Sequence, residues 1–340
     1  MQIIKIALVG LGNVHRSLLK ILSDKQDRLS KEFGLSFSIV AIADSSGVAV
    51  NEAGFDPVNI LEHKIAGKHV CEFDGFRDDV AVGNMLDACE CDLVFEASPV
   101  DLKTGGVGLT ICRQALTKGI SVVLANKAPL VLAFKELHRL ADMGNAALKY
   151  SATVCGGLPV LNVGSRDFPV ADISEISGIF NSTSNFILDS MAGGKSFDVA
   201  LEEAQERGIA EADPSLDIKG WDTANKLSII ANTVLGADIG LDDIAVQGIE
   251  QVEVDFVLAE KAKGNAVKLV ASAKNGNFSV GPKVIPQSEF LAQCTGWEMA
   301  VEIHTDIFGI NYFKLWEREP IPTAASMLRD AVHIFSSRVN

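Results

Sequence analysis

Residues 3–15 read IIKIALVGLGNVH, and this stretch decides how the first part of the chain is interpreted. Residues 3–9 are apolar and rich in β-branched side chains, as expected of a strand that is buried on both faces. Gly10 and Gly12 interrupt this pattern, and a helical spacing of apolar residues follows over residues 13–33. The stretch therefore predicts a buried strand, a tight glycine turn and a helix.

The same alternation continues to about residue 150. A second apolar strand over residues 37–43 completes a βαβ unit, which implies two parallel strands. Further strands are predicted over residues 92–97, 120–124 and 147–151, and further helices over residues 78–89, 111–118 and 130–142. This pattern predicts an α/β fold in which residues 1–150 form a dinucleotide-binding domain on a Rossmann-type, doubly wound parallel sheet.

The character of the sequence changes at the Gly/Pro-rich stretch ATVCGGLP, residues 152–159, which is typical of a domain junction. Beyond it, strands are predicted over residues 173–180 and 278–281, and helices over residues 183–191, 197–207, 221–235 and 322–335. We expect residues 151–310 to form a second, α+β domain on a mixed sheet, and residues 311–340 to pack back onto the first domain. The second domain is expected to bind substrate and to form a homodimer, because the chain does not obviously cover one face of its sheet.

Charge and cysteine content restrict the function class. The 340 residues carry a formal net charge of -14, so the surface repels nucleic acids and anionic membranes, and we expect neither as a partner. No apolar stretch reaches the roughly 18 residues of a membrane span, and the N-terminus lacks the features of a signal peptide. The six cysteines show no metal-binding spacing and are interpreted as reduced thiols, so the expected compartment is the cytoplasm.

The glycine turn is the first candidate site. Gly10-x-Gly12-x-x-His15 stands where a dinucleotide fingerprint belongs: the first glycine permits the tight turn, and the second lets the backbone approach a pyrophosphate at the helix N-terminus. His15 replaces the third glycine, which should adjust packing more than phosphate binding. The expected cofactor-binding residues are Gly10, Leu11, Gly12, Asn13, Val14, Asp44, Ser98 and Lys127.

Two of these residues allow an alternative interpretation. Asp44 ends the second strand, where a carboxylate accepts hydrogen bonds from the adenine ribose and repels a 2′-phosphate. Because Ser45 follows it rather than an arginine, NAD is expected to be preferred over NADP. Alternatively, Asp44 is a turn residue in Asp-Ser-Ser-Gly. Ser98 is either a contact to the nicotinamide ribose or part of a simple turn with Pro99.

Two segments carry candidate catalytic charges. Lys127, in the segment LANKAP, follows a buried strand, where a lysine can donate a proton or polarise a carbonyl. In GIAEADPSLDIKGWDTANK, residues 208–226, Asp222 and Lys226 are four residues apart on one predicted helix and face the same way. Alternatively, Lys127 is a solvated loop lysine, and Asp222 and Lys226 form an ordinary surface ion pair.

These segments together resemble homoserine dehydrogenases. The resemblance covers about residues 1–270 in consistent order, and the sequence PTA at residues 322–324 also fits. The matching motifs are AEADP at 210–214 with Asp217, Gly220, Asp222 and Lys226, ANK at 125–127, ATV at 152–154 with Gly156, Gly157 and Pro159, and Asn181, Thr183, Ser184, Asn185, Ile187, Leu188 and Met191.

The resemblance implies NAD(P)-dependent reduction of L-aspartate 4-semialdehyde to L-homoserine, on the way to threonine and methionine. It assigns proton transfer and carbonyl polarisation to Lys127 and Lys226, with Asp222 as their partner. This suits the chemistry, because hydride transfer to an aldehyde creates an alkoxide that needs a nearby cation or acid. The substrate-binding residues that it implies are Glu211 and Asp217 for the ammonium group, and Thr183 with Lys226 for the polar end.

The sequence departs from the family pattern at three places. Ser182 replaces a glycine in the Asn-Gly-Thr motif, and Trp316-Glu317-Arg318-Glu319 replaces a Gly-rich turn. Ser151 stands in place of a metal-binding glutamate, so a monovalent cation, Na⁺ or K⁺, would rest on the carbonyls of Val154 and Gly156. The regulatory domain of some members is absent from the sequence, so we expect a short form without threonine feedback through that domain.

Two other functions remain as alternatives. Ser182 and the altered turn at Trp316 favour a dehydrogenase for another short hydroxy or oxo amino acid. A non-catalytic dinucleotide-binding protein is the second alternative. The joint presence of Lys127, Asp222 and Lys226 argues against it, because a sensor has no use for a proton-transfer pair.

Overall fold

A computed structural model describes residues 1–316 and 320–336 of the chain. The chain divides into two compact units. Unit 1 comprises Met1–Gly156 and Glu319–Asn340, and unit 2 comprises Gly157–Arg318. The chain passes from the first unit to the second within the Gly/Pro-rich stretch 152–159.

Unit 1 is built on a seven-stranded sheet in the order β4-β3-β2-β1-β5-β6-β7. Its strands are β1 (Gln2–Val9), β2 (Leu35–Asp44), β3 (Gly47–Phe55), β4 (Phe76–Arg77), β5 (Leu93–Glu96), β6 (Ser121–Leu124) and β7 (Leu148–Lys149). β1 pairs in parallel with both β2 and β5, and parallel pairing continues to β6 and β7. The predicted doubly wound sheet is thereby confirmed, with a reversal of strand order at β1, where such sheets bind ligands. The antiparallel strands β3 and β4 are an extension that the sequence pattern did not predict.

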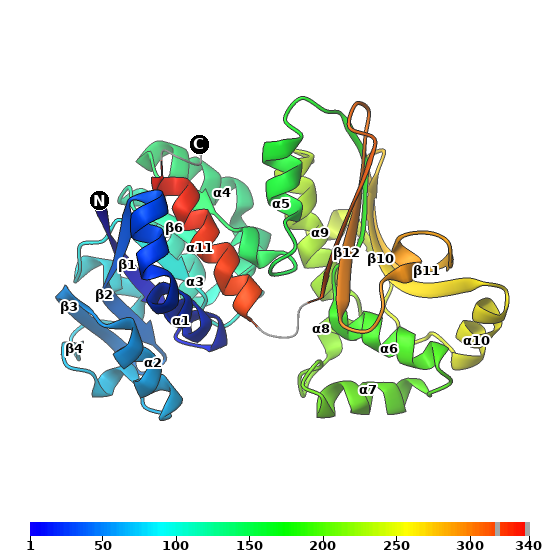
Figure 1. Ribbon diagram of the computed structural model, residues 1–340, viewed down its shortest axis with the longest axis horizontal. Helices are drawn as coiled ribbons and strands as arrows, with labels where there is room; N and C mark the ends of the chain where they lie inside the picture. The colour runs from blue at the N-terminus through cyan, green and yellow to red at the C-terminus, as the bar shows by residue number, and fades with distance from the viewer. Residues whose placement is uncertain (317–319, 337–340) are drawn as a thin grey trace. The chain divides into compact units, whose positions relative to one another are not determined.

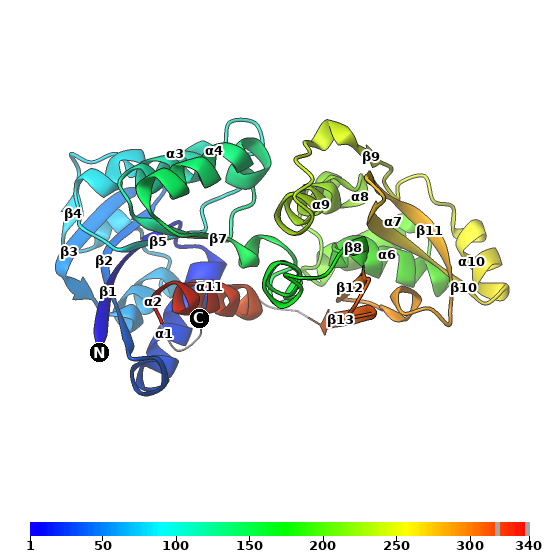
Figure 2. The ribbon, with the colours of Figure 1, turned by 90° about the horizontal axis from the view of Figure 1, so that it is seen from above.

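Helices cover both faces of this sheet, as Figures 1 and 2 show. α3 and α4 lie together on one face, and α1, α2 and α11 lie on the other. The bounds are α1 (Asn13–Arg28), α2 (Pro57–Ile65), α3 (Gly106–Thr117), α4 (Ala128–Gly144) and α11 (Ile321–Phe335). The core on the α1 side includes Leu8 of β1, Leu18 and Leu19 of α1, and Met327 of α11, all of them fully buried. Burial of these side chains holds α1 against β1 and α11, with the N-terminus of α1 directly after the glycine turn.

Two predicted helices of unit 1 differ in the structure. α1 ends at Arg28, and a single π-helical turn over Leu29–Phe33 follows it, closed by Gly34 with a φ of 72°. The range 78–89 contains only the short 3₁₀ helix Val82–Asp87. Aspartate and glycine residues in that range are poor helix formers, which explains why a regular helix does not form there.

Unit 2 is built on a six-stranded sheet in the order β13-β12-β8-β10-β11-β9. Its strands are β8 (Ile173–Ile179), β9 (Ile244–Val246), β10 (Asn265–Lys274), β11 (Asn277–Pro286), β12 (Glu298–Thr305) and β13 (Ile310–Trp316). Its helices are α5 (Val160–Asn162), α6 (Ser182–Ala192), α7 (Phe197–Glu206), α8 (Ser215–Ile218), α9 (Trp221–Val234) and α10 (Val254–Ala262). All neighbouring strands are antiparallel except β9 and β11, so the predicted mixed sheet is confirmed. Helices α6, α9 and α10 pack against β10.

The chain returns to unit 1 later than the predicted range 311–340. β13 instead pairs with β12 in the second sheet, and its exposed and partly buried residues alternate, as expected of an edge strand with one solvated face. The return is made by α11, which packs against α1.

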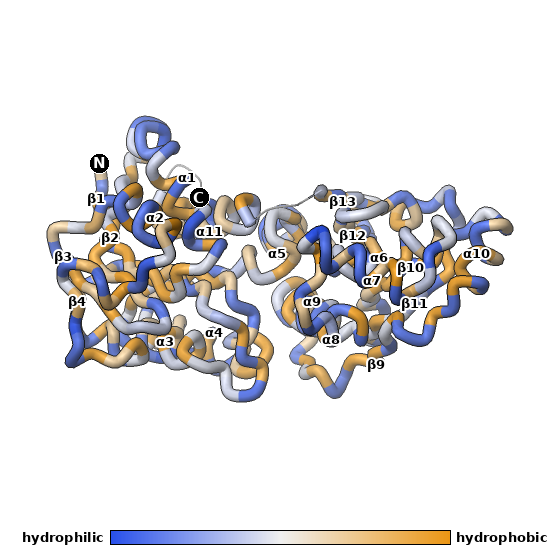
Figure 3. Tube along the Cα trace, turned by 90° about the horizontal axis from the view of Figure 1, so that it is seen from below, coloured by the Kyte–Doolittle hydropathy of each residue, from blue (hydrophilic) through white to orange (hydrophobic). Residues whose placement is uncertain are grey.

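Figure 3 shows hydrophobic and hydrophilic residues interspersed along the helices, as expected of helices with one buried face. Within the described ranges, no helix is long and apolar enough to span a bilayer.

Candidate active site

The turn after β1 has the geometry of a phosphate-binding loop. Gly10 has a φ of 85°, and a Cβ added there would lie 2.6 Å from the Ser98 Cα, so only glycine fits. A Cβ added to Gly12 would meet nothing within 4 Å, so this part of the backbone is open to a ligand. Gly12 is the N-cap of α1 and no side chain from the described residues caps the helix. The first N–H groups of α1 and the positive end of its dipole therefore suit an anion.

His15 supports this turn from the first turn of α1. Its side chain is fully buried, and its Nδ1 lies 2.6 Å from the Gly10 carbonyl oxygen. Because a carbonyl oxygen only accepts, Nδ1 carries the proton and donates it to Gly10. Burial lowers the pKa of His15 to about 4, so the ring is neutral near pH 7. The residue in place of the third glycine thus hydrogen-bonds the first glycine of the turn.

Asp44 lies at the end of β2, and both of its carboxylate oxygens have protein donors. Oδ1 accepts hydrogen bonds from the backbone N–H of Ser46 at 2.8 Å and from the Ser46 hydroxyl at 2.6 Å. Oδ2 accepts from Lys64 Nζ at 2.7 Å and from the backbone N–H of Val70 at 3.2 Å. Despite partial burial, the Lys64 and Ser46 hydrogen bonds hold the pKa of Asp44 below its usual value. A ribose hydroxyl would have to share this carboxylate with the Ser46 turn, which the sequence offered as the alternative interpretation of Asp44. It would also have to share it with the nearly buried ion pair to Lys64, which the sequence did not reveal.

The segments that follow β5 and β6 meet at the same edge of the sheet. The Glu96 carboxylate accepts a hydrogen bond from the Ser98 N–H at 2.9 Å, and the Asn126 amide donates to the Ser98 hydroxyl at 3.3 Å. The Asn126 side-chain oxygen also accepts from the N–H of Ala128, at 3.0 Å. Lys127 is the half-buried N-cap residue of α4. Ser98, offered from sequence as a ribose contact or a turn residue, is therefore a buried member of this network.

In unit 2, Asp222 and Lys226 form an ion pair on α9, with 2.8 Å between Nζ and Oδ2. Their side chains are only 9% and 14% exposed, so this is not an ordinary surface pair. Lys226 Nζ also donates to the Phe180 carbonyl at 2.6 Å, at the end of β8. The Asn181 amide donates to Asp222 at 2.9 Å and to Asp217 at 2.7 Å. Asn181 thus joins the ion pair to a second acidic residue, a role that was not assigned to it from sequence.

The other substrate-binding candidates lie on neighbouring segments of unit 2. Thr183 is buried near the start of α6, and its hydroxyl donates to the Ile209 carbonyl at 3.0 Å. This bond fixes the loop that leads to Glu211, whose side chain is exposed. Asp217 lies on the single turn α8, where it accepts the Asn181 hydrogen bond.

The candidate cation ligands, the carbonyls of Val154 and Gly156, lie at the end of the first of the two segments of unit 1, Met1–Gly156. Val154 has extended backbone, and Cys155 and Gly156 both have a φ of 53°. The Gly156 carbonyl accepts a hydrogen bond from the Ser326 hydroxyl at 3.0 Å, which leaves it one lone pair. Among the residues that the structure describes, no group of three or more His, Cys, Asp or Glu side chains forms a metal site. Trp316 is the exposed last residue of β13, and residues 317–319 of the altered turn lie outside the described residues.

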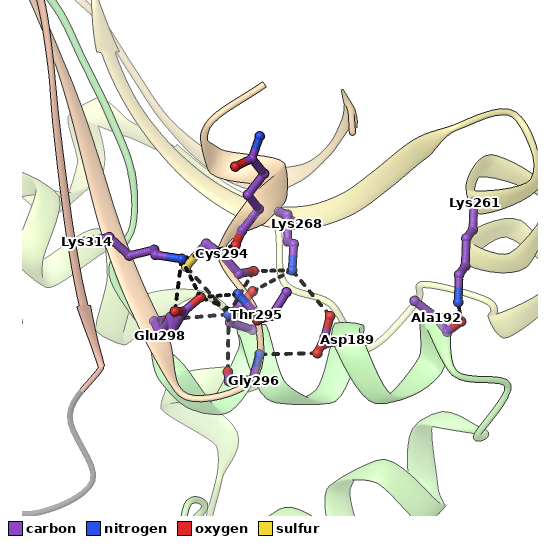
Figure 4. Close-up of polar contacts among 11 residues, drawn as sticks. Asp189, Ala192, Lys261, Lys268, Cys294, Thr295, Gly296, Glu298 and Lys314 are labelled. Atoms are coloured by element: carbon purple, nitrogen blue, oxygen red, sulfur yellow. Dashed lines mark hydrogen bonds and ion pairs between the residues drawn. The ribbon is translucent and has the colours of Figure 1, made fainter. Parts of the chain in front are cut away.

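Asn185, which carried part of the family resemblance, hydrogen-bonds a different cluster, whose members Lys268, Asp189 and Cys294 are labelled in Figure 4. Lys268 of β10 is almost fully buried and donates to the Asn185 side-chain oxygen at 3.0 Å and to the Cys294 carbonyl. Asp189 of α6 lies 3.7 Å from the same ammonium group. Burial lowers the pKa of Lys268. This cluster attaches α6 to the sheet and so positions the start of that helix, where Asn181 and Thr183 lie.

Known proteins match both the sequence and this geometry. A family model described as homoserine dehydrogenase matches residues 159–332. An NAD(+)-dependent homoserine dehydrogenase from Pseudomonas canavaninivorans is 30% identical, over 98% of this chain and 96% of its own length. The chain belongs to the homoserine dehydrogenase family. The resemblance drawn from the sequence motifs is thereby confirmed.

Solved structures of homoserine dehydrogenases share the fold. A putative homoserine dehydrogenase from Archaeoglobus fulgidus has a TM-score of 0.89 and 33% identity, over 98% of this chain and 100% of that chain. A hyperthermophilic archaeal homoserine dehydrogenase in complex with NADPH has a TM-score of 0.84 and 27% identity, over 97% of each chain. The chain is therefore an oxidoreductase that binds a nicotinamide dinucleotide, and the open turn at Gly10 and Gly12 fits the pyrophosphate of that cofactor.

Proposed function

We propose that the protein catalyses the reversible reduction of L-aspartate 4-semialdehyde to L-homoserine, with unit 1 binding the dinucleotide and unit 2 the substrate. The observation that carries this proposal is the nearly buried Lys226–Asp222 pair on α9, joined through Asn181 to Asp217. Charged side chains are rarely this buried unless they are paired or used in chemistry. The family match supports the same substrate.

Lys226, Asp222 and Lys127 are the proposed catalytic residues. A dinucleotide bound to unit 1 would supply the hydride for the aldehyde carbon, and negative charge would then develop on the carbonyl oxygen of the substrate. An ammonium group beside that oxygen stabilises the charge and delivers the proton that completes the alcohol. Asp222, at 2.8 Å from the Lys226 Nζ, orients that ammonium and compensates its charge. Lys127, at the N-cap of α4, is proposed as the second cation in the same reaction.

The amino-acid end of the substrate needs anions for its ammonium group and donors for its carboxylate. Glu211 and Asp217 are the proposed ammonium ligands, and the segment between them is held in place by the Thr183–Ile209 hydrogen bond. Thr183 and Lys226 are proposed to hold the polar end of the substrate. Ser182, at the first position of α6, occupies space that a glycine would leave open. A dehydrogenase that acts on another short hydroxy amino acid is therefore the second candidate, and the substrate panel must distinguish the two.

We propose that NAD is preferred over NADP. Asp44 places a negative charge at the end of β2, where a 2′-phosphate would be repelled, and Ser45 offers no cation to such a phosphate. Lys64 compensates much of that charge, so we expect a modest preference, on the order of tenfold in kcat/KM. The remaining proposed dinucleotide contacts are Leu11, Asn13, Val14 and Ser98, beside Gly10 and Gly12.

A monovalent cation at the carbonyls of Val154 and Gly156 is proposed as a supporting ligand. The Gly156 carbonyl oxygen has a second lone pair beside the one that accepts from Ser326. Replacement of Na⁺ and K⁺ by a bulky organic cation should then lower activity. Unchanged activity would remove the cation from the proposal.

A homodimer through the second sheet is also proposed, in the cytoplasm, where the six free thiols would stay reduced. One face of the edge strand β13 exposes Ile310, Tyr312 and Trp316, which are 50%, 50% and 60% exposed, with Lys314 between Tyr312 and Trp316. A row of large apolar side chains on an edge strand is typical of a surface that another chain covers. Light scattering at micromolar concentration should report a dimer, and the substitution Tyr312→Glu should shift it toward monomer.

The deciding assay is steady-state oxidation of L-homoserine with NAD and with NADP, followed by a panel of short hydroxy amino acids. We expect turnover of homoserine, and Lys226→Ala should reduce kcat by a factor of about 100 or more. Turnover of another substrate but not of homoserine would favour the related dehydrogenase. Dinucleotide binding without turnover of any substrate would favour the non-catalytic alternative.

A further inference from the structure

Glu96 is a buried acid that the chemistry proposed above does not use. It is the last residue of β5, and its side chain is 0% exposed. In the sheet, β5 lies between β1, which leads to the glycine turn, and β6, which leads to Asn126 and Lys127. Glu96 therefore lies where the three segments that follow these strands come together.

The contacts of Glu96 connect two of those segments. Its carboxylate accepts hydrogen bonds from the Ser98 N–H at 2.9 Å and from the side chains of Ser98 and Asn126. Its backbone carbonyl accepts from the Ala125 N–H at 2.9 Å. Asn126 in turn donates to Ser98 and accepts from Ala128. One carboxylate thus ties the segment after β5 to the segment that carries Lys127.

The space around Glu96 is also shaped for this side chain. A Cβ added to Gly108 of α3 would lie 2.7 Å from the Asn126 amide nitrogen and 3.0 Å from Glu96 Oε1, so glycine makes room for both. Glu96 Oε2 is buried and has no hydrogen-bond partner among the described residues. Such an oxygen disfavours a full negative charge. Burial accordingly raises the pKa of Glu96 to about 7.

We propose that Glu96 is a positioning residue for the dehydrogenase: its carboxylate holds the segments after β5 and β6, with Ser98 and Lys127 on them, in the arrangement that binds the dinucleotide. The inference rests on the proposed function only through the dinucleotide, and not through the identity of the amino-acid substrate. The buried or partly buried titratable groups on β1, α1, α3 and the segment after β6 are His15 and Arg16 on α1, Cys112 on α3 and Lys127, whereas Lys5 of β1 and Arg113 of α3 are exposed. Burial keeps His15 neutral above about pH 5 and keeps Cys112 as the thiol, so neither titrates near pH 7.

The test compares Glu96→Leu with Glu96→Gln, and measures the dissociation constant of NADH by fluorescence titration and kcat separately. Leucine removes every acceptor, so NADH should bind about tenfold more weakly and kcat should fall at least as much. Glutamine keeps the side-chain carbonyl that accepts from Ser98, so it should restore both values to within about threefold. Glu136→Gln is the matched control. Glu136 is an exposed carboxylate on α4 that pairs with Arg113 of α3, and its loss should change neither value.

The pH dependence of NADH affinity gives a second readout, which would not change if Glu96 only stabilised the fold. Ionised Glu96 accepts stronger hydrogen bonds than the protonated form, so wild-type affinity for NADH should rise as the pH increases through about 7. Glu96→Gln should lack this rise, whereas Glu136→Gln should keep it. If Glu96→Leu does not fold, this comparison alone decides. Wild-type NADH affinity in Glu96→Leu, or an unaltered pH profile in Glu96→Gln, would overturn the proposal, whatever the outcome with homoserine.

Discussion

Replacement of Lys226 by methionine tests the ion pair on α9 most sharply. Methionine keeps an unbranched side chain of similar length but removes the ammonium group. The structure gives that group two strong contacts, to the Phe180 carbonyl at 2.6 Å and to Asp222 at 2.8 Å. A hydrogen bond to a charged group contributes about 1.5–3 kcal/mol, so the loss of both should destabilise the fold by about 3–5 kcal/mol, as is typical when one partner of a buried pair is removed.

The assay for this prediction is denaturant unfolding at fixed protein concentration, together with homoserine oxidation. Lys226→Met should lower the stability of the fold by that amount and reduce kcat at least about 100-fold. The double variant Lys226→Met/Asp222→Leu should recover much of the stability, because no buried charge then lacks its partner, but none of the activity.

The chain offers a matched control for the same experiment. Lys31 and Asp27 are also four residues apart and 3.0 Å from each other, but their side chains are 74% and 90% exposed. Lys31→Met should therefore cost about 0.5 kcal/mol or less and leave kcat unchanged. A Lys226→Met variant that is as stable as Lys31→Met and keeps kcat within about threefold of wild type would contradict this prediction.

Three further outcomes are expected. Asp44→Asn leaves the Lys64 ammonium without its carboxylate, so kcat/KM for NADP should rise relative to NAD by about tenfold, and an unchanged ratio would exclude Asp44 from cofactor selection. The contribution of His15 to stability should fall by roughly 3 kcal/mol as the pH drops from about 6.5 to about 4, because the unfolded chain binds a proton at His15 in this window and the folded chain does not. Glu96, whose pKa is raised in the fold, contributes in the opposite direction, so the decline is measured as the difference between wild type and a His15 variant. Calorimetry across this pH range should show that His15→Gln lacks that part of the decline. Thr183→Val, which cannot donate to the Ile209 carbonyl, should raise the KM for homoserine more than it lowers kcat, and the opposite pattern in steady-state kinetics would remove Thr183 from substrate binding.

The fold could be predicted from sequence wherever local pattern decides it. Residues 3–9 are apolar except for Lys5 and lie in β1 (Gln2–Val9), and the spacing of leucines after the glycine turn predicts α1. The antiparallel strand β3 was missed because Asp44 to Gly47 was interpreted as a loop, and a loop of that composition is also a hairpin turn. Residues 311–316 were assigned to the first domain because chains of this design often return there at the end, and their pairing with β12 is a tertiary contact that the local sequence does not show.

The candidate site could be predicted only where charges lie close together in sequence. Asp222 and Lys226 lie on the same helix, so their spacing of four residues predicts the ion pair. Lys64 lies 20 residues after Asp44, and Asn181 lies far from Asp217, so only the folded chain brings these partners together. Glu96 at the end of an apolar strand gave no signal of its own, because a single acid there is usually exposed, and its burial depends on α3 and on Asn126.

The most direct test of the central claim is the fate of the hydrogen at the reacting carbon. L-homoserine with both hydrogens at C4 replaced by deuterium should be incubated with the purified enzyme and NAD, and both products analysed by mass spectrometry. The proposed reaction predicts one deuterium in the reduced dinucleotide for each aldehyde formed, and the loss of this transfer in Lys226→Met. Reduced dinucleotide without deuterium, or no reduction at all, would contradict the assignment of the protein as a homoserine dehydrogenase in function.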